Sequence, residues 1–152
     1  MILHRQMLLV ALIAVCGCSQ TPPTMPVGIR VPNGWNVVIA EPNNKMRFEG
    51  ATFYARMESP LPPDKAALTF GNTMVAGVAK GFDMEGPTAL SDEERTQYKD
   101  SQGKFERRHA LERSKYSSGW KVFLSNEPSY YAIYAFPHKN GSVVELLSIS
   151  AL

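Results

Sequence analysis

The end of the chain constrains the fold most, because its apolar residues recur at strand spacing through three consecutive segments. Trp120, Val122 and Leu124 occupy alternate positions, and residues 130–136 and 142–150 are rich in aromatic and β-branched side chains. Turn-forming residues separate the three segments, and the Asn140-Gly141 pair is a strong hairpin signal. The pattern predicts a three-stranded antiparallel meander over the last 33 residues or so.

Two further strands are expected nearer the start of the domain. The first covers 35–40, after a turn signal at 31–34, and the second covers 45–57. The apolar set of the second strand changes parity at Gly50, where a β-bulge would keep both halves facing one core. In the first strand, three side chains are expected on one face: Trp35, Val37 and Ile39.

The segment between these strands and the meander is predicted to be mainly helical. Residues 65–80 have helical apolar spacing, with Asp64 as the expected N-cap and Gly81 as the expected C-cap. Residues 82–90 contain Gly-Pro and are expected to form a loop. The expected apolar helix face comprises Ala67, Leu68, Phe70, Gly71, Met74, Val75 and Val78.

A second helix is expected to begin at a capping box. Ser91 is followed three residues later by Glu94, and the helix should run to about Ser101. Residues 104–115 fit either a helix or a strand, and Gly103 favours the strand. The order of strands and helices favours an α+β fold, a sandwich-like antiparallel sheet with helices packed on it.

The N-terminal stretch has the features of a secretory signal. Arg5 lies in a short polar start, an apolar run covers 7–15, and small residues follow. The ending Val15-Cys16-Gly17-Cys18 resembles the lipobox of bacterial lipoproteins. This resemblance implies cleavage after Gly17, lipid attachment to Cys18 and, with Ser19 next, an outer-membrane protein facing the periplasm. Lipidation of Cys16 is the rival interpretation, but Val15 would then be at the cleavage site.

These features predict a signal peptide at 1–17, a lipidated and Pro-rich tether at 18–28, and a single α+β domain at 29–152. Met25 and Val27 leave open the alternative that the tether packs on the domain. Removing 1–17 leaves 135 residues with 15 basic and 14 acidic side chains, a balance that gives no case for nucleic-acid binding. With Cys18 lipidated, stability must come from packing, without an intrachain disulfide.

The domain also resembles the Mog1/PsbP-like group, which includes bacterial lipoproteins of the DcrB kind. The resemblance rests on the Val-Pro-Asn-Gly-Trp opening at 31–35, one early hairpin, a helix and a closing meander that begins with Gly119-Trp120. It implies a sandwich used as a binding or assembly module, and no functional residue is transferred.

Motifs that carry chemistry are absent from the sequence. It contains no zinc, calcium, P-loop or esterase signature. After the signal, His109 and His138 are the two remaining histidines, far apart in sequence, and each is interpreted as a surface or hairpin residue. We therefore predict no catalytic residue, no cofactor and no metal site.

Two features suggest a place for a protein partner. Tyr130, Tyr134 and Phe136 share one strand face, where exposed tyrosines would suit an interface; the alternative is ordinary sheet core. Glu145 lies among Val143, Leu147 and Ile149 at strand spacing. It could bind a partner's cation or have a raised pKa, or it could face solvent and pair with a cation across the sheet.

The sequence thus predicts a lipid-anchored, non-enzymatic module that binds another protein in the cell envelope and contacts the membrane through Cys18. An immunity protein that neutralises a periplasmic toxin is one alternative. A small hydrolase acting on cell wall or lipid is a second.

Overall fold

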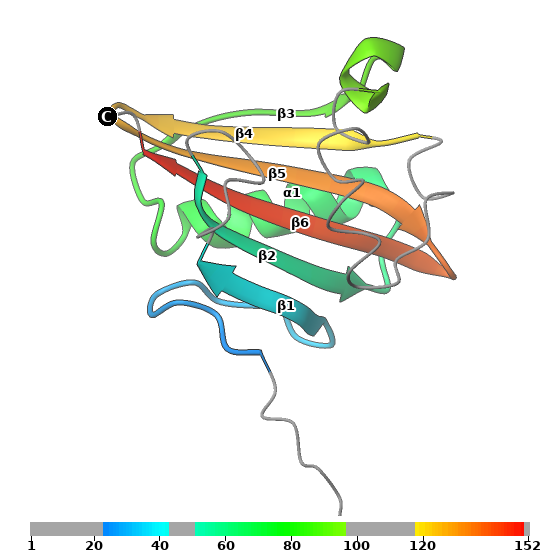
Figure 1. Ribbon diagram of the computed structural model, residues 1–152, viewed down its shortest axis with the longest axis horizontal. Helices are drawn as coiled ribbons and strands as arrows, with labels where there is room; N and C mark the ends of the chain where they lie inside the picture. Colours follow the sequence, from blue (N-terminus) through cyan, green and yellow to red (C-terminus); the bar gives the residue numbers. More distant parts are fainter. Residues whose placement is uncertain (1–22, 43–50, 97–117, 151–152) are drawn as a thin grey trace, which may run out of the picture.

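A six-stranded antiparallel sheet with a helix on one face forms the domain (Figure 1). The computed structural model describes residues 23–42, 51–96 and 118–150. The strand order in the sheet is β1-β2-β6-β5-β4-β3. The elements are β1 (Asn36–Pro42), β2 (Ala51–Ser59), α1 (Pro63–Val75), β3 (Asp83–Ala89), β4 (Trp120–Asn126), β5 (Ser129–His138) and β6 (Gly141–Ser150). The α+β class and its antiparallel sheet are confirmed.

The core lies between α1 and the sheet. The buried helix residues are Ala66, Ala67, Phe70, Gly71 and Met74. They pack on side chains of β2, β4, β5 and β6 that are fully buried, among them Met57, Leu124, Ile133 and Leu146. Small residues permit a close approach here, since a Cβ at Gly71 would lie only 3.0 Å from Cγ1 of Val122.

Helix α1 is shorter than its apolar pattern predicts. It begins at Pro63, with Pro62 rather than Asp64 as the N-cap, and ends at Val75. Residues 76–80 form turns in which the Ala79 N–H donates to the Met74 carbonyl, which brings Ala79 into the core. Leu68 and Val78, expected on the apolar face, are 36% and 39% exposed. Gly81 follows these turns with a φ of +83°.

The expected loop at 82–90 is wrong, because Asp83–Ala89 forms the edge strand β3. Met84 pairs with Leu124 and Thr88 with Lys121, and the register shifts between them. Gly86-Pro87 lies within this shift, where the missing N–H of proline is tolerated at a sheet edge. The closing meander therefore has four strands in the described residues rather than the three expected.

The hairpins of the meander agree with the sequence. The two strand pairs β4–β5 and β5–β6 are joined by two-residue turns at 127–128 and 139–140. In β1 one expectation fails: Val37 packs in the core beside α1, whereas Ile39 belongs to the opposite face. A register shift between these two residues separates them.

The capping box is confirmed, because the Glu94 N–H donates to Ser91 Oγ at 3.1 Å and helical geometry covers 92–96. The bulge at Gly50, the far end of this helix and the segment 104–115, with His109, lie outside the described residues. The signal peptide, Cys16 and Cys18 also lie outside them. In the described part of the chain, no helix is long and apolar enough to cross a membrane.

Candidate functional site

Four side chains form a row across the sheet on the face opposite α1. The strand register pairs Arg56 on β2 with Glu145 on β6, Glu145 with Tyr134 on β5, and Tyr134 with Lys121 on β4. We call these four residues the polar row. Directly paired side chains in an antiparallel sheet lie on the same face and within contact distance. The register alone therefore brings a cation, a carboxylate, a phenol and a second cation together.

The first half of the polar row is a buried ion pair. Arg56 Nη2 lies 2.6 Å from Glu145 Oε1, and the two side chains are 1% and 0% exposed. Arg56 Nε donates to the Tyr54 hydroxyl at 3.1 Å. Burial, followed by the negative charge of Glu145, raises the pKa of Tyr54 well above its usual value. Because both side chains are buried, removal of either charge would leave the other uncompensated, and each therefore depends on its partner.

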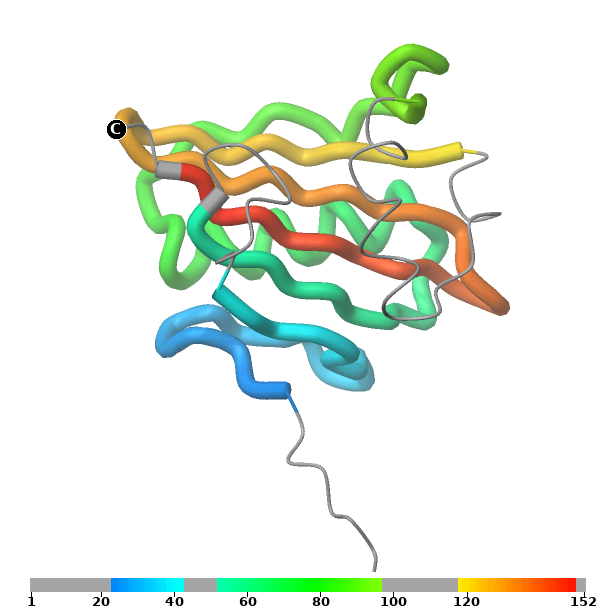
Figure 2. Tube along the Cα trace, in the orientation of Figure 1, coloured from blue at the N-terminus to red at the C-terminus, as the bar shows by residue number. Residues whose placement is uncertain are grey.

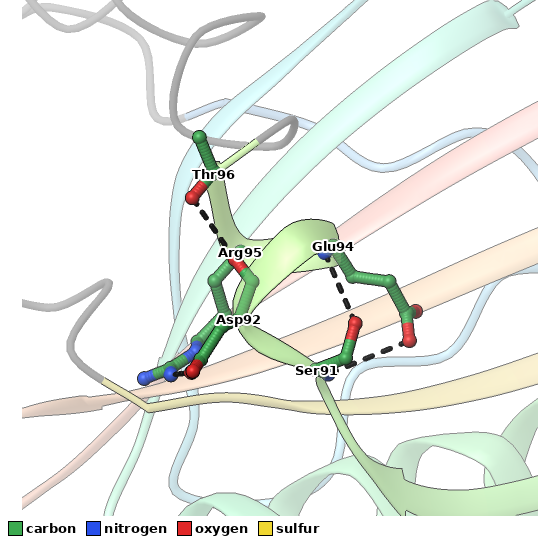
Figure 3. Close-up of polar contacts among 5 residues, drawn as sticks. All are labelled: Ser91, Asp92, Glu94, Arg95 and Thr96. Carbon is green, nitrogen blue, oxygen red and sulfur yellow. Dashed lines mark hydrogen bonds and ion pairs between the residues drawn. The ribbon is translucent and has the colours of Figure 1, made fainter.

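The second half of the polar row, Tyr134 and Lys121, reaches the capping box through an ion pair between Lys121 and Glu94. Lys121 Nζ donates to Glu94 Oε2 at 2.5 Å, while Glu94 Oε1 accepts the Ser91 N–H at 3.4 Å. Figure 3 shows how the turn at 91–96 directs the Glu94 carboxylate back to Ser91, and how Arg95 pairs with Asp92. The hydrogen bond from Lys121 lowers the pKa of Glu94. The capping box thus ties the segment after β3 to the sheet.

Tyr134, between the two ion pairs, is half-buried. It packs with Leu90, Phe136 and Val143 on one side and with the cluster around Leu147 on the other. Burial, then the negative charges of Glu94 and Glu145, raises its pKa. The phenol therefore remains neutral at physiological pH, and its hydroxyl can donate a hydrogen bond.

An aromatic pair lies on the same face of the sheet. The rings of Phe123 and Tyr130 stack with centroids 5.7 Å apart and planes at 18°. Tyr130 pairs directly with Ile149, and all three side chains are half-buried. Partial desolvation and the carboxylate of Glu127 raise the pKa of Tyr130. We call Phe123, Tyr130 and Ile149 the aromatic patch.

The four residues predicted to bind a partner differ in how much of each side chain is exposed. All four project from the face opposite α1, since the residues between them on β5 and β6 pack in the core beside the helix. The strand spacing predicted that Tyr130, Tyr134 and Phe136 share a face but left open which face it is. Phe136 and Glu145 are 0% exposed, so they present no surface in this conformation, whereas Tyr130 and Tyr134 are half-buried. Glu145 does pair with a cation across the sheet, but away from solvent. Partner binding by these residues stays a prediction.

Sequence reasoning missed the partners of these residues, namely Arg56, Lys121, Phe123 and Glu94. A signal for Arg56 was present, because a lone cation in the apolar run 53–57 requires a carboxylate nearby. Arg56 pairs with Glu145 because β2 lies next to β6 in the sheet. No local pattern specifies that pairing of strands more than 80 residues apart.

A groove lies at the β5–β6 hairpin, apart from the polar row and the aromatic patch. An open groove of about 360 Å³ is lined by residues that include Asn36, Glu58, His138 and Asn140. His138 Nε2 lies 3.3 Å from Glu58 Oε1, and Lys139 Nζ lies 3.9 Å from the same oxygen. The Ser142 hydroxyl in the groove donates to the Leu61 carbonyl at 2.5 Å and is thereby engaged. The arrangement is a surface charge cluster around Glu58.

No group of three or more metal-ligating side chains is present in residues 23–42, 51–96 and 118–150. Comparisons of the chain with protein-family models, with curated proteins and with solved structures found no match.

Proposed function

We propose that this chain is a lipid-anchored protein of the bacterial cell envelope whose domain binds another protein through the aromatic patch. The lipobox supports attachment at Cys18 to the outer membrane, with the domain facing the periplasm. The observation that carries the binding role is the stacked, half-buried Phe123–Tyr130 pair on the sheet face that α1 leaves uncovered. The absence of catalytic motifs in the sequence favours a non-enzymatic module.

The chemistry of the patch suits a protein interface. Aromatic rings with a polar tip provide contact area at low entropic cost, and tyrosine is enriched among residues that dominate binding energy. The neighbouring Arg56–Glu145 pair supports the patch from within the sheet, because its geometry fixes β2 against β6. A rigid platform reduces the ordering cost when a partner binds.

The binding role is tested by photo-crosslinking in cells. A benzoylphenylalanine at Tyr130 should yield a discrete crosslinked adduct, and the same group at Asn72, exposed on α1, should yield none. Tyr130→Ala should then weaken binding of the identified partner by roughly 2 kcal/mol or more. Equal adducts at both positions, or none at Tyr130, would refute the binding role of the patch.

Tyr134→Ala serves as the structural comparison. Because Tyr134 packs on both neighbouring clusters, its truncation should lower the melting temperature more than Tyr130→Ala does. A larger drop for Tyr130→Ala would assign that ring to the core instead of the interface.

The anchor is tested by fractionation. Cys18→Ala should leave uncleaved precursor and abolish acylation of the chain, whereas Cys16→Ala should change little. If Cys16→Ala blocks processing instead, cleavage occurs at a different position from the one proposed.

The finer fold assignment is part of the same proposal. We infer membership of the Mog1/PsbP-like group from the β1–β2 hairpin, α1 and the closing strands β4 to β6, with Gly119-Trp120 at the start of β4. An experimental structure that superposes poorly on members of this group would refute the assignment, although the α+β class would stand.

A further inference from the structure

The N-terminal arm leaves the domain beside an exposed apolar turn. Met25 packs against the core, and the Ile29 N–H donates to the Pro26 carbonyl at 3.2 Å, which closes a turn around Val27. That turn lies against the residues that follow α1. A Cβ at Gly28 would be 3.7 Å from Val78 Cγ2, and one at Gly77 would be 3.7 Å from the Gly28 carbonyl oxygen. Figure 2 shows both turns on the same side of the molecule.

The two turns together expose apolar and cationic side chains. Val27 is 102% exposed and Val78 is 39% exposed. The segments 23–31 and 76–82 each contain a single charged residue, Arg30 and Lys80, and both are exposed. We call Val27, Arg30, Val78 and Lys80 the anchor-side surface. Apolar side chains flanked by cations match the interface of an anionic membrane, where the cations meet lipid phosphates.

The length of the tether indicates that the binding partner of this surface is the membrane. Six residues lie between Cys18 and Met25, and the seven residue steps from one to the other span at most about 25 Å when fully extended. A lipid on Cys18 therefore confines the arm, and the turn two residues beyond Met25, close to the headgroups. A short tether gives an effective concentration in the millimolar range, at which even weak contacts become populated.

We propose that the anchor-side surface rests on the phospholipid headgroups and orients the domain on its membrane. This inference rests on the proposed lipid anchor at Cys18. The arm enters the sheet at β1, and β3 forms the opposite edge, five strand spacings or about 24 Å away. With the β1 side toward the lipid, Phe123 on β4 and Tyr130 on β5 are held away from the membrane, where a protein partner has access.

The test uses the processed, lipidated full chain in vesicles of phosphatidylethanolamine and phosphatidylglycerol. Cys18 is acylated and Cys16 is removed, so an introduced cysteine is the single free thiol for an NBD label. Vesicles that contain a headgroup nitroxide should quench NBD at Val78→Cys. They should leave unquenched the matched label at Thr88→Cys, which is exposed on β3 at the far edge.

A second variant tests the side chains themselves. With NBD at Ala76→Cys, an exposed neighbour of Val78, the combined changes Val27→Ser and Val78→Ser should abolish the quenching. Both valines are exposed, so folding is retained. Two results would overturn this inference alone, provided that the chain floats with the vesicles. The first is equal quenching at positions 78 and 88, and the second is quenching at position 76 that survives both substitutions. Failure to float would overturn the anchor and this inference together.

Discussion

The Arg56 guanidinium and the Glu145 carboxylate face each other on adjacent strands with almost no access to solvent. Transfer of either charge out of water costs several kcal/mol, and the attraction between them offsets that cost only while both are present. Tyr54 adds an acceptor for Arg56 Nε. At the scale of single residues, each buried charge of the polar row is thus stabilised by its counter-charge. This dependence can be tested by substituting one partner at a time.

We predict that Arg56→Met and Glu145→Leu each lower the free energy of unfolding by about 3–5 kcal/mol, since each leaves a buried charge without its counter-charge. The double variant should be clearly more stable than the sum of the single effects implies, because no buried charge remains. Urea unfolding of all four proteins gives the coupling energy. Additive single effects would contradict a mutual ion pair.

The contribution of the Glu94–Lys121 ion pair to the free energy of unfolding should depend on pH. The Lys121 ammonium lowers the pKa of Glu94 in the folded chain, so the stabilisation is present above the unfolded carboxyl pKa and is lost as the pH falls through the folded value. Both side chains are 38% exposed, which limits the effect of Glu94→Gln at neutral pH to below about 1 kcal/mol. Unfolding curves of both proteins should converge in strong acid. A difference that persists there would exclude the ion pair as its cause.

Among the elements, the strands with alternating residues were predictable, and the one with Gly-Pro was not. The pattern located β4, β5 and β6, because each buries one or both faces. It failed for β3, whose residues are nearly all exposed and which forms the edge of the sheet beside β4. The C-terminal end of α1 was misplaced because the turns at 76–80 continue to bury an apolar residue, Ala79, after the helix has ended. The same limit applies to the site: strand spacing grouped Tyr130, Tyr134 and Phe136, but their partners come from the sheet order.

The β5–β6 hairpin depends on a glycine for steric reasons. A Cβ at Gly141 would lie 2.0 Å from the Ser59 carbonyl oxygen and 3.0 Å from Pro60 Cα. Since both neighbours are backbone, Gly141→Ala should lower the stability by about 2 kcal/mol or more. The matched control is Gly81→Ala, which meets open space but has a φ of +83° and should cost about 1 kcal/mol. Thermal melting ranks the two, and a smaller loss at Gly141 would mean that the hairpin shifts freely away from β2.

For the whole molecule, the structure places the start of the packed chain nearer to Cys18, the proposed point of lipid attachment, than the sequence predicts. The sequence placed the tether at 18–28, whereas Met25 already contacts the core. If Cys18 is lipidated as proposed, each residue that packs on the domain shortens the tether and would bring the domain closer to the lipid. The arm would thus link the packing of the domain to its proposed orientation, since the residues that follow Met25 form one of the two exposed turns of the anchor-side surface.

Met25 and Val27 form a matched pair for testing where the folded domain begins. Met25→Ala should lower the free energy of unfolding by about 1 kcal/mol, because a half-buried methionine loses part of the transfer energy of a fully buried one. Val27→Ala should change it by less than about 0.5 kcal/mol, because that side chain is fully exposed. Urea unfolding measures both, and limited proteolysis should give a stable fragment that retains Met25. Equal, negligible effects of the two substitutions, together with a fragment that begins near Ile29, would restore a free tether up to Gly28.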